Sequence, residues 1–427
     1  MIAVLILFWL IGIFLSVKWP TFFVAYFIIA STKFLGFIDP STFIVNGIEF
    51  GYFGLNIIAL VGSFLSITWY NIPKKSILIM FIILAMLIYG ISKPLFDGNS
   101  TFLQSFMASK EIWFYFIFFY LVSHREKIKS EQIITLIKWI GLYFSLIYIF
   151  GILVPGIVPL YYFDDEIIRV YYPTYISLAL FLFAVDLKTK GQSKIKSIVP
   201  ISMLLVSLVF AGYASLTIMS VIGLVGYLFI YHEKKLLNKK SILAFIIMSV
   251  LIVLLLILIN EETYNYLLTS IYDIISGNDP SISSRMLYNE FRWEFINRQR
   301  EFGYGFIHQS SEIMKSMNTS DSNRYMQRLG VIDSGYVDMF TKFGFIGTAV
   351  IIVIFLKFIV SGYLQKNKNT LSLAMVFYFS QYFFVNYTWS VFTFAHGIIP
   401  GVIALYMIFW NQSYKSKRTK KKLVYQA

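Results

Sequence analysis

Long apolar runs, separated by short polar segments, follow one another along most of the chain. A helix needs about 20 such residues to cross the hydrocarbon core of a bilayer, with a range of about 17–25. The runs predict spans at residues 2–17, 21–38, 51–70, 77–92, 104–122, 133–153, 172–187, 197–211, 214–231, 241–259, 340–361, 371–389 and 394–411. The first two are short or interrupted, so the pattern predicts about 12–13 transmembrane helices. We therefore expect an all-α polytopic membrane protein.

Lysines mark every second polar connection between the predicted spans. They gather in residues 72–76, 124–129, 186–196, 232–240, 365–369 and the tail 414–422. Short loops rich in lysine or arginine remain in the cytoplasm when a membrane protein inserts. The C-terminus is therefore predicted to be cytoplasmic and, with thirteen spans, the N-terminus to lie outside. The first run lacks a basic leader and a small-residue cleavage site, so we expect a retained helix.

The opposite side of the membrane is predicted to carry most of the remaining polar residues. Residues 93–103 and 154–171 would form modest outer loops, and 260–339 a large one. A connection that long is usually functional or disordered. Apolar residues recur at close to helical spacing within 283–302, and Gly303 is a helix-stop signal, so we expect this loop to be partly helical. The chain then divides into transmembrane helices (1–259), an extracytoplasmic loop (260–339) and C-terminal transmembrane helices with a basic tail (340–427).

The composition agrees with a membrane protein. The chain is 58% hydrophobic and 14% charged, whereas soluble domains are about 45–50% apolar and about 25% charged. It has no cysteine, which excludes disulfides and thiol chemistry. A net charge of +14 is compatible with nucleic-acid binding, but its lysines lie in the predicted cytoplasmic connections. We therefore expect a lipid bilayer, and no nucleic acid, as the partner of these charges.

The arginines are distributed differently from the lysines between the two predicted sides of the membrane. Seven of the nine are predicted to lie outside: Arg169, Arg285, Arg292, Arg298, Arg300, Arg324 and Arg328. The guanidinium group is a planar fork that binds phosphate or carboxylate through two hydrogen bonds, which an ammonium group does not do. A functional anion site would account for arginines on the side where lysine is scarce.

Two of these arginines are spaced to act together. Arg285 and Arg292 are seven residues apart, so on a helix they share a face that could hold a diphosphate beside the membrane. The alternative is an interfacial helix whose arginines pair with nearby glutamates. For Arg298 and Arg300 we favour a solvated face.

A series of motifs carries a more specific signal. "SSR" (283–285), "RW" (292–293), "GYG" (303–305) and "VIDSGYVDMFTKFGFIG" (331–347) follow one another before a predicted span. In this order and topology the chain resembles the Wzy-type O-antigen and polysaccharide polymerases and the related O-antigen ligases. "IIRVYYPTYISLAL" (167–180) is similar to the family's second arginine stretch, although Arg169 lacks the family's ten-residue spacing to a glycine.

The resemblance implies an enzyme of the bacterial cytoplasmic membrane. Polymerases of this type join undecaprenyl-diphosphate-linked oligosaccharide repeats, one as donor and one as acceptor, on the outer face. A chain-length regulator and a flippase are possible partners. The ligase-type histidine before the final spans is absent, and Asp333–Ser334 stands in its place. This departure favours a polymerase, with a ligase as the alternative.

The reaction requires two kinds of group. Departure of a lipid diphosphate needs positive charge, which Arg169 and Arg285 would supply, supported by Arg292. The acceptor hydroxyl needs orientation and a base, for which Asp333 and His308 are candidates. Asp333 could instead cap a helix, and a lone loop histidine is often incidental. Asp338 and His396 are further candidates on the same side.

Other residues of the motifs would bind the substrate. Aromatic rings can serve as platforms for sugars, and glycines allow tight turns or a close approach of the backbone. The substrate-binding candidates are Arg292, Trp293, Gly303, Tyr304, Gly305 and Tyr336. The sequence shows no dense cluster of carboxylates and histidines at ligand spacing, so we expect neither a metal nor another cofactor.

Two functions of other classes remain open. A flippase or other transporter of lipid-linked oligosaccharides has a similar number of spans, but no internal repeat stands out in this sequence. A non-enzymatic assembly or sensing protein would leave the order of the motifs unexplained.

Overall fold

The computed structural model describes residues 2–35, 44–45, 48–65, 74–153, 161–164, 167–170, 172–187, 194–210, 213–231, 276, 292–308, 311, 313, 334–364 and 370–424. The first helices are α1 (Ile2–Lys18), α2 (Pro20–Ser31), α3 (Phe50–Leu65), α4 (Lys74–Phe96), α5 (Phe102–Ala108), the 3₁₀ helix η3 (Ile112–Tyr115), α6 (Phe116–Ser123) and α7 (Ser130–Leu153). The others are α8 (Pro173–Asp186), α9 (Lys194–Phe210), α10 (Ala214–Tyr231), α15 (Gly335–Tyr363), α16 (Thr370–Thr388) and α17 (Ala395–Val424). The fold is that of an all-α polytopic membrane protein.

Most predicted spans coincide with helices. The exception is 241–259, which lies outside the described residues. Among the described residues, three helices are long and apolar enough to cross a membrane by themselves: Ile77–Phe96, Ser130–Gly151 and Gly335–Tyr363. Phe102–Ala108 and Ile112–Ser123 meet at 54° and form a broken span or a re-entrant loop. The shorter apolar helices include α2, α8 and the first part of α17.

Two described helices run beyond the predicted spans, and one predicted loop contains strands. The structure begins α15 at Gly335, earlier than the predicted 340, and continues α17 into the basic tail, beyond the predicted end at 411. The predicted loop 154–171 contains an antiparallel hairpin of β3 (Tyr161–Asp164) and β4 (Ile167–Val170). Aromatic residues in β3 and β-branched residues in β4 favour strands here. A second small hairpin joins β1 (Ile44–Val45) to β2 (Ile48–Glu49).

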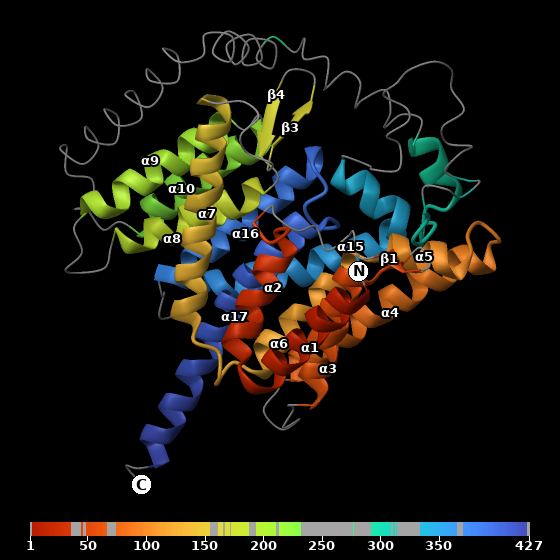
Figure 1. Ribbon diagram of the computed structural model, residues 1–427, viewed down its shortest axis with the longest axis horizontal. Coiled ribbons are helices and arrows are strands. Elements are labelled where there is room, and N and C mark those ends of the chain that lie inside the picture. The colour runs from red at the N-terminus through yellow and green to blue at the C-terminus, as the bar shows by residue number, and fades with distance from the viewer. Residues whose placement is uncertain are drawn as a thin grey trace.

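The centre of the bundle is α8. Nearly all of its residues are buried, and α7, α9, α10, α16 and α17 surround it (Figure 1). Polar side chains join these helices inside the bundle: Gln381 donates a hydrogen bond to Ser177, and Ser220 donates one to Gln381. Small polar residues of this kind link helices where lipid offers no hydrophobic driving force for their association. By contrast, α1, α4 and α15 expose large apolar side chains on their outer faces, as lipid-facing helices do.

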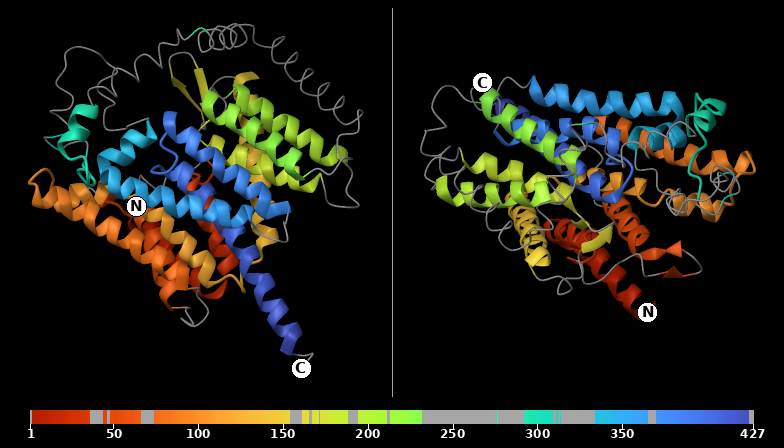
Figure 2. Two further views of the ribbon diagram at one scale, coloured as in Figure 1. Left: turned by 180° about the vertical axis from the view of Figure 1, so that it is seen from behind. Right: turned by 90° about the horizontal axis from the view of Figure 1, so that it is seen from above.

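The helices end at two opposite ends of the bundle. We call one the loop end; there α4 and α16 finish and α15 and α17 begin (Figure 2). We call the other the tail end, because α17 projects from it (Figure 1). At the tail end Thr21 bonds to the backbone of Lys127 and Lys129, so the start of α2 meets the connection between α6 and α7.

Candidate functional site

The helix α15 is broken near the loop end. Gly344 has φ 62° and ψ −172°, which interrupts the helix between its first turns and its long apolar part. In a continuous helix the carbonyls of Thr341 and Lys342 would accept hydrogen bonds from the N–H groups of Phe345 and Ile346. The break separates these donors and acceptors, and a membrane interior has no water to satisfy them.

The missing bonds are made by another part of the chain, which we call the docking segment (residues 300–306). Tyr304 and Gly305 donate their N–H groups to Thr341 and Lys342 over 2.8 and 3.0 Å. In return the carbonyls of Arg300 and Glu301 accept from Phe345 and Ile346 over 2.9 and 3.1 Å. All four groups released by the break are thus paired, as buried backbone groups require.

The glycines of "GYG" are required by this close approach. Gly303 and Gly305 have φ values of 70° and 78°, in the left-handed region that side chains disfavour. A Cβ atom on Gly303 would lie 2.5 Å from the nitrogen of Gly344 and 2.7 Å from the carbonyl oxygen of Thr341. These two glycines, predicted to bind substrate, therefore have a packing role that needs no substrate.

The docking segment also completes a second helix. Pro94 lies inside α4 and has no N–H group to donate to the carbonyl of Gly90, four residues earlier. Phe306 donates its N–H to that carbonyl over 2.6 Å. One short segment therefore bridges α4 and α15 at the positions where each helix lacks a bond of its own.

A helix over residues 292–298 precedes the docking segment and packs on α15. The ring of Trp293 lies 5.5 Å from that of Phe340 and 6.2 Å from that of Phe345, and Ile296 is buried against Val337. Trp293 therefore holds this helix in place, and the sugar-platform role predicted for it stays a prediction. The helix and the glycine that follows it agree with the described part of the prediction for 283–302, of which residues 283–291 lie outside the described residues.

The arginines of this region lie on its outer side. Arg298 is 61% exposed and pairs with Glu294 over 2.9 Å. Arg300 is exposed and lies over the ring of Phe345. The solvated face expected for this pair is therefore confirmed. Arg292 lies at the start of the helix and is partly exposed.

The two tyrosines of the motifs are anchored by their hydroxyl groups. Tyr304 is buried and donates to the carbonyl of Phe295, and Tyr336 donates to that of Phe383, each over 2.7–2.8 Å. Burial raises the pKa of the Tyr304 phenol, so this hydroxyl stays protonated and remains a donor. Both residues were predicted to bind substrate, and both connect elements of the fold.

The proposed catalytic residues are only partly described. Arg169 lies on β4 opposite Tyr162, four residues before α8 begins at Pro173, and its side chain lies outside the description. Arg285 and Asp333 are outside the described residues. His308 is partly buried just after the docking segment, and its carbonyl accepts from the N–H of Ser311. The hairpin and the helix 292–298 share the loop end but lie over different parts of it (Figures 1 and 2).

Two acidic residues near the docking segment make contacts that the sequence did not predict. Asp338, weighed above only as a further candidate, is buried and pairs with Lys342 over 2.7 Å. Glu111, which sequence reasoning missed, accepts the N–H of Ala395 at the start of α17 over 2.6 Å. Glu111 also lies near enough to Asp338 and Lys342 for their charges to act on it. No local pattern marks Glu111, because it meets these groups only through the bend between α5 and η3.

His396 was a further candidate on the same side. Its ring is stacked between those of Trp389 and Phe394, with centroids 4.6 and 5.6 Å away. The hydroxyl of Thr174 donates to its carbonyl, which ties the start of α17 to that of α8. His396 is therefore held rigidly at the loop end.

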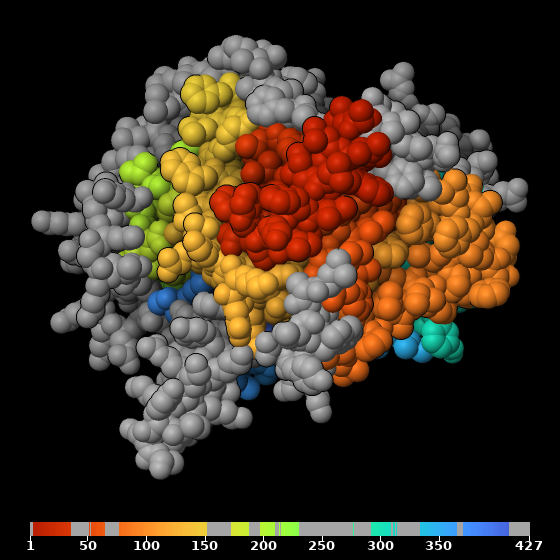
Figure 3. Space-filling model, turned by 60° about the horizontal axis from the view of Figure 1, so that its bottom comes forward, coloured from red at the N-terminus to blue at the C-terminus, as the bar shows by residue number. Residues whose placement is uncertain are grey.

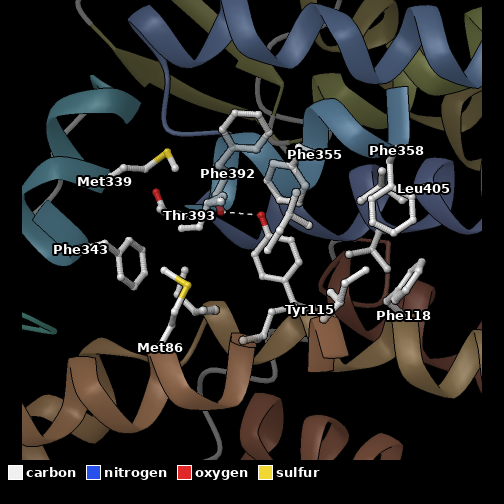
Figure 4. Close-up of a pocket in the computed structure, with 16 residues that line it drawn as sticks. Met86, Tyr115, Phe118, Met339, Phe343, Phe355, Phe358, Phe392, Thr393 and Leu405 are labelled. Carbon is white, nitrogen blue, oxygen red and sulfur yellow. Dashed lines mark hydrogen bonds between the residues drawn. The ribbon is translucent and has the colours of Figure 1, made fainter. Parts of the chain in front are cut away.

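An apolar cavity lies directly beneath the docking segment. It is lined from α4, α6, α15 and α17, and Met86, Met339, Phe343 and Thr393 lie at the end nearer the docking segment (Figure 4). The hydroxyl of Tyr115 donates to the carbonyl of Phe392 at its wall, which leaves the lining almost free of polar surface. After the break the lining on α15 runs from Ile351 to Phe358, which corresponds to about 10 Å of helix. Phe343 joins the two parts of the site, because its ring also packs edge-on against that of Phe306.

These features define a class: a helical membrane protein in which a polar segment completes two interrupted spans above an apolar cavity. Within the described residues no group of three or more histidines, aspartates or glutamates is placed to hold a metal ion. Residues 197–352, which run from α9 through the docking segment into α15, match the family model described as O-antigen ligase. This match supports the superfamily of O-antigen polymerases and ligases, and confirms the resemblance drawn from the motifs. No curated protein matches the chain.

Proposed function

We propose that this protein is a polysaccharide polymerase that joins oligosaccharide repeats carried on undecaprenyl diphosphate. The observation that carries the proposal is the docking segment, which holds an arginine-bearing helix against two spans and over an apolar cavity. A lipid-linked substrate has a matching arrangement, because its anionic head suits the arginines and its long hydrocarbon chain suits the apolar cavity.

The reaction is a glycosyl transfer. A hydroxyl oxygen of the acceptor attacks the anomeric carbon of the donor sugar, and the bond from that carbon to the diphosphate oxygen breaks. The hydroxyl proton passes to a base, and the lipid diphosphate leaves with the bonding electrons. Fixed positive charge stabilises the leaving group most effectively in a site sheltered from water.

Arginine is suited to that task because it stays charged and binds oxygens in pairs. We assign the diphosphate to Arg169 and Arg285, with Arg292 in support. Asp333 and His308 remain candidates for the base. The roles of Trp293, Gly303, Tyr304 and Gly305 are then indirect, since their contacts hold the segment that follows Arg285 and Arg292. Tyr336 acts indirectly too, because it joins α15 to α16.

We further propose that the loop end faces the outside of the bacterial cytoplasmic membrane and that the C-terminus is cytoplasmic. The lysine pattern supports this orientation. The lysines of 124–129 and those of the tail then belong to the same side, which fits the meeting of α2, α6 and α7 at the tail end.

A ligase is the second candidate, because the matching family model is described as O-antigen ligase. A ligase shares the donor and the leaving group, and differs in its acceptor. Cells that lack the protein would separate the candidates through the length of their glycans. Single repeats in place of long polymer support the polymerase. Intact polymer left on its lipid carrier indicates the ligase, and repeats trapped inside the cell indicate a flippase.

A further inference from the structure

Three charged side chains meet at the loop end beside the docking segment, and we call Glu111, Asp338 and Lys342 the charged cluster. Lys342 pairs with Asp338 over 2.7 Å, one turn earlier on α15. Its ammonium group also lies 5.8 Å from the centre of the Phe394 ring, just before α17. Glu111 accepts the N–H of the next residue, Ala395, over 2.6 Å. The bend before η3 and the starts of α15 and α17 therefore bring these charges together.

The apolar cavity begins directly beside the charged cluster. Each charged residue is followed in the chain by a residue that lines the cavity: Ile112, Met339 and Phe343. Met339 and Phe343 lie at the end of the cavity nearer the docking segment (Figure 4). The cluster therefore lies where the apolar cavity meets the polar loop end. When the hydrocarbon chain of a lipid-linked substrate occupies the cavity, the reacting head of that substrate lies at this boundary.

The cluster is approached from the loop end. Glu111 is partly exposed there, whereas Asp338 is only 3% exposed. The opposite side of the bundle is packed: Figure 3 looks toward the tail end, where α1 and α2 (red) lie against the region of α6 and α7 (amber), with no opening between them in this view. Of the two carboxylates, Glu111 is therefore the one that a sugar hydroxyl can approach.

The charges of the cluster favour Glu111 as the group that takes up a proton. Lys110, Lys342 and Asp338 act on Glu111 through their charges. A proton on Asp338 would weaken its direct ion pair with Lys342. A proton on one oxygen of Glu111 leaves that pair intact, and the oxygen bonded to Ala395 can still accept its N–H. Proton uptake by Glu111 therefore disturbs the fewest contacts.

We propose that Glu111 is the base of the glycosyl transfer, an inference that rests on the proposed function. The acceptor hydroxyl passes its proton to the carboxylate of Glu111 while its oxygen bonds to the anomeric carbon of the donor. The bond from that carbon to the diphosphate oxygen breaks, and the lipid diphosphate leaves with the bonding electrons. The N–H of Ala395 holds the carboxylate in place. This assignment gives Glu111 the role for which Asp333 and His308 are the other candidates.

Glu111→Gln tests the assignment in the purified full chain with lipid-linked repeats. The amide oxygen of glutamine still accepts the N–H of Ala395, but it cannot take up the proton of a hydroxyl. We expect kcat to fall about a hundredfold or more, since a positioned base contributes about 10²–10⁴-fold, with KM and the melting temperature unchanged. Glu294→Gln is the matched control, because it makes the same change at the loop end in a side chain that is 68% exposed. Its kcat should equal that of the wild type.

The pH dependence of kcat separates a base from a structural carboxylate. The wild-type kcat should fall as the pH is lowered, because protonated Glu111 accepts no proton, and the residual kcat of Glu111→Gln should lack this fall. Ala395→Pro removes the N–H that holds Glu111, at the first position of a helix, where proline is tolerated. It should keep the fall with pH. If Ala395→Pro instead matches Glu111→Gln in kcat and pH profile, Glu111 only fastens α17 and the inference is overturned.

The remaining outcomes separate this inference from the proposed function. A wild type that extends no lipid-linked repeats overturns the polymerase and this inference with it. A wild type that extends them beside an equally active Glu111→Gln overturns this inference alone. So does a fall with pH that persists in Glu111→Gln and disappears in Asp333→Asn or His308→Gln, because the base is then one of those two residues.

Discussion

The main-chain nitrogen of Phe306 lies 2.6 Å from the carbonyl oxygen of Gly90, the acceptor that Pro94 leaves without a donor inside α4. A proline placed in a span is thereby turned into an attachment point for a segment more than 200 residues later in the chain. The same segment attaches to α15 at its own break. Both attachments are backbone hydrogen bonds, so they depend on helix geometry and on glycine, and the side chains of Trp293 and Tyr304 add further contacts.

Restoring the missing donor should weaken this attachment. In Pro94→Ala the new N–H competes with Phe306 for the carbonyl of Gly90, and α4 can close its own bond. Hydrogen exchange at the amide of Phe306 should become faster. Pro200→Ala, which changes another proline inside a helix, serves as the control and should leave that amide unchanged. Slow exchange of Phe306 in Pro94→Ala would contradict the role given to the proline.

Gly303 should tolerate no side chain. In Gly303→Ala the left-handed backbone costs about 1–2 kcal/mol, and the new Cβ would collide with the backbone of α15 at Gly344. We expect an unfolding free energy lowered by more than about 2 kcal/mol. Gly98→Ala is the matched control, because Gly98 has the same φ of 70° and nothing within 4 Å of the added atom. Thermal unfolding in detergent should show a small loss for Gly98→Ala and a large one for Gly303→Ala.

The arginines should differ in how well lysine replaces them. At a diphosphate site Arg285→Lys and Arg169→Lys keep the charge and remove the paired donors. A hydrogen bond to a charged group is worth about 1.5–3 kcal/mol, so polymerisation should slow about ten- to a hundredfold. Arg298→Lys should cost little, because its side chain is exposed and paired with Glu294.

The same arginine-to-lysine variants also test whether the diphosphate has been assigned to the correct arginines. Equal protein levels in the membrane are the control for every variant. Normal polymerisation by the lysine variants at Arg169, Arg285 and Arg292 would show that the diphosphate is held elsewhere. A damaging Arg298→Lys beside a silent Arg285→Lys would place the site on the other face of the helix.

Single cysteines in this cysteine-free chain test the orientation. Asn297 is exposed on the helix 292–298, and Lys129 is exposed at the tail end. Ser311 belongs to the same loop but is only 3% exposed, which makes it a poor position for labelling. An impermeant maleimide should label Asn297→Cys in intact cells and spare Lys129→Cys until the cells are opened. The reverse pattern would place the loop end in the cytoplasm.

Activity should survive a chelator. The sequence has no dense group of carboxylates and histidines at ligand spacing on the predicted outer side. Purified enzyme with lipid-linked repeats should therefore extend them in excess chelator. Complete loss of activity, with recovery on addition of magnesium or manganese, would make residues 164–166 the first place to seek a metal site.

The sequence by itself determined the membrane character, the positions of most described helices and the resemblance to one superfamily, which the family model supports. Apolar runs long enough to cross a bilayer are local features, so residues 133–153 and 371–389 could be recognised without their neighbours. The order of "RW", "GYG" and "DSGY" is likewise readable along one segment. The exposed face of Arg298 also followed from local spacing, because charged neighbours four residues apart pair on one side of a helix.

Only the tertiary structure decided what those motif residues do. A broken helix leaves specific carbonyls and N–H groups unpaired, and a membrane interior obliges the protein to pair them internally. Which groups are freed depends on the backbone at Gly344 and Pro94, but their partners at 300–306 lie about 40 and about 210 residues away. No periodicity links such distant positions. For the same reason the sequence could not show that Trp293 and Tyr304, which it predicts as substrate contacts, also anchor the segment that pairs with two helices.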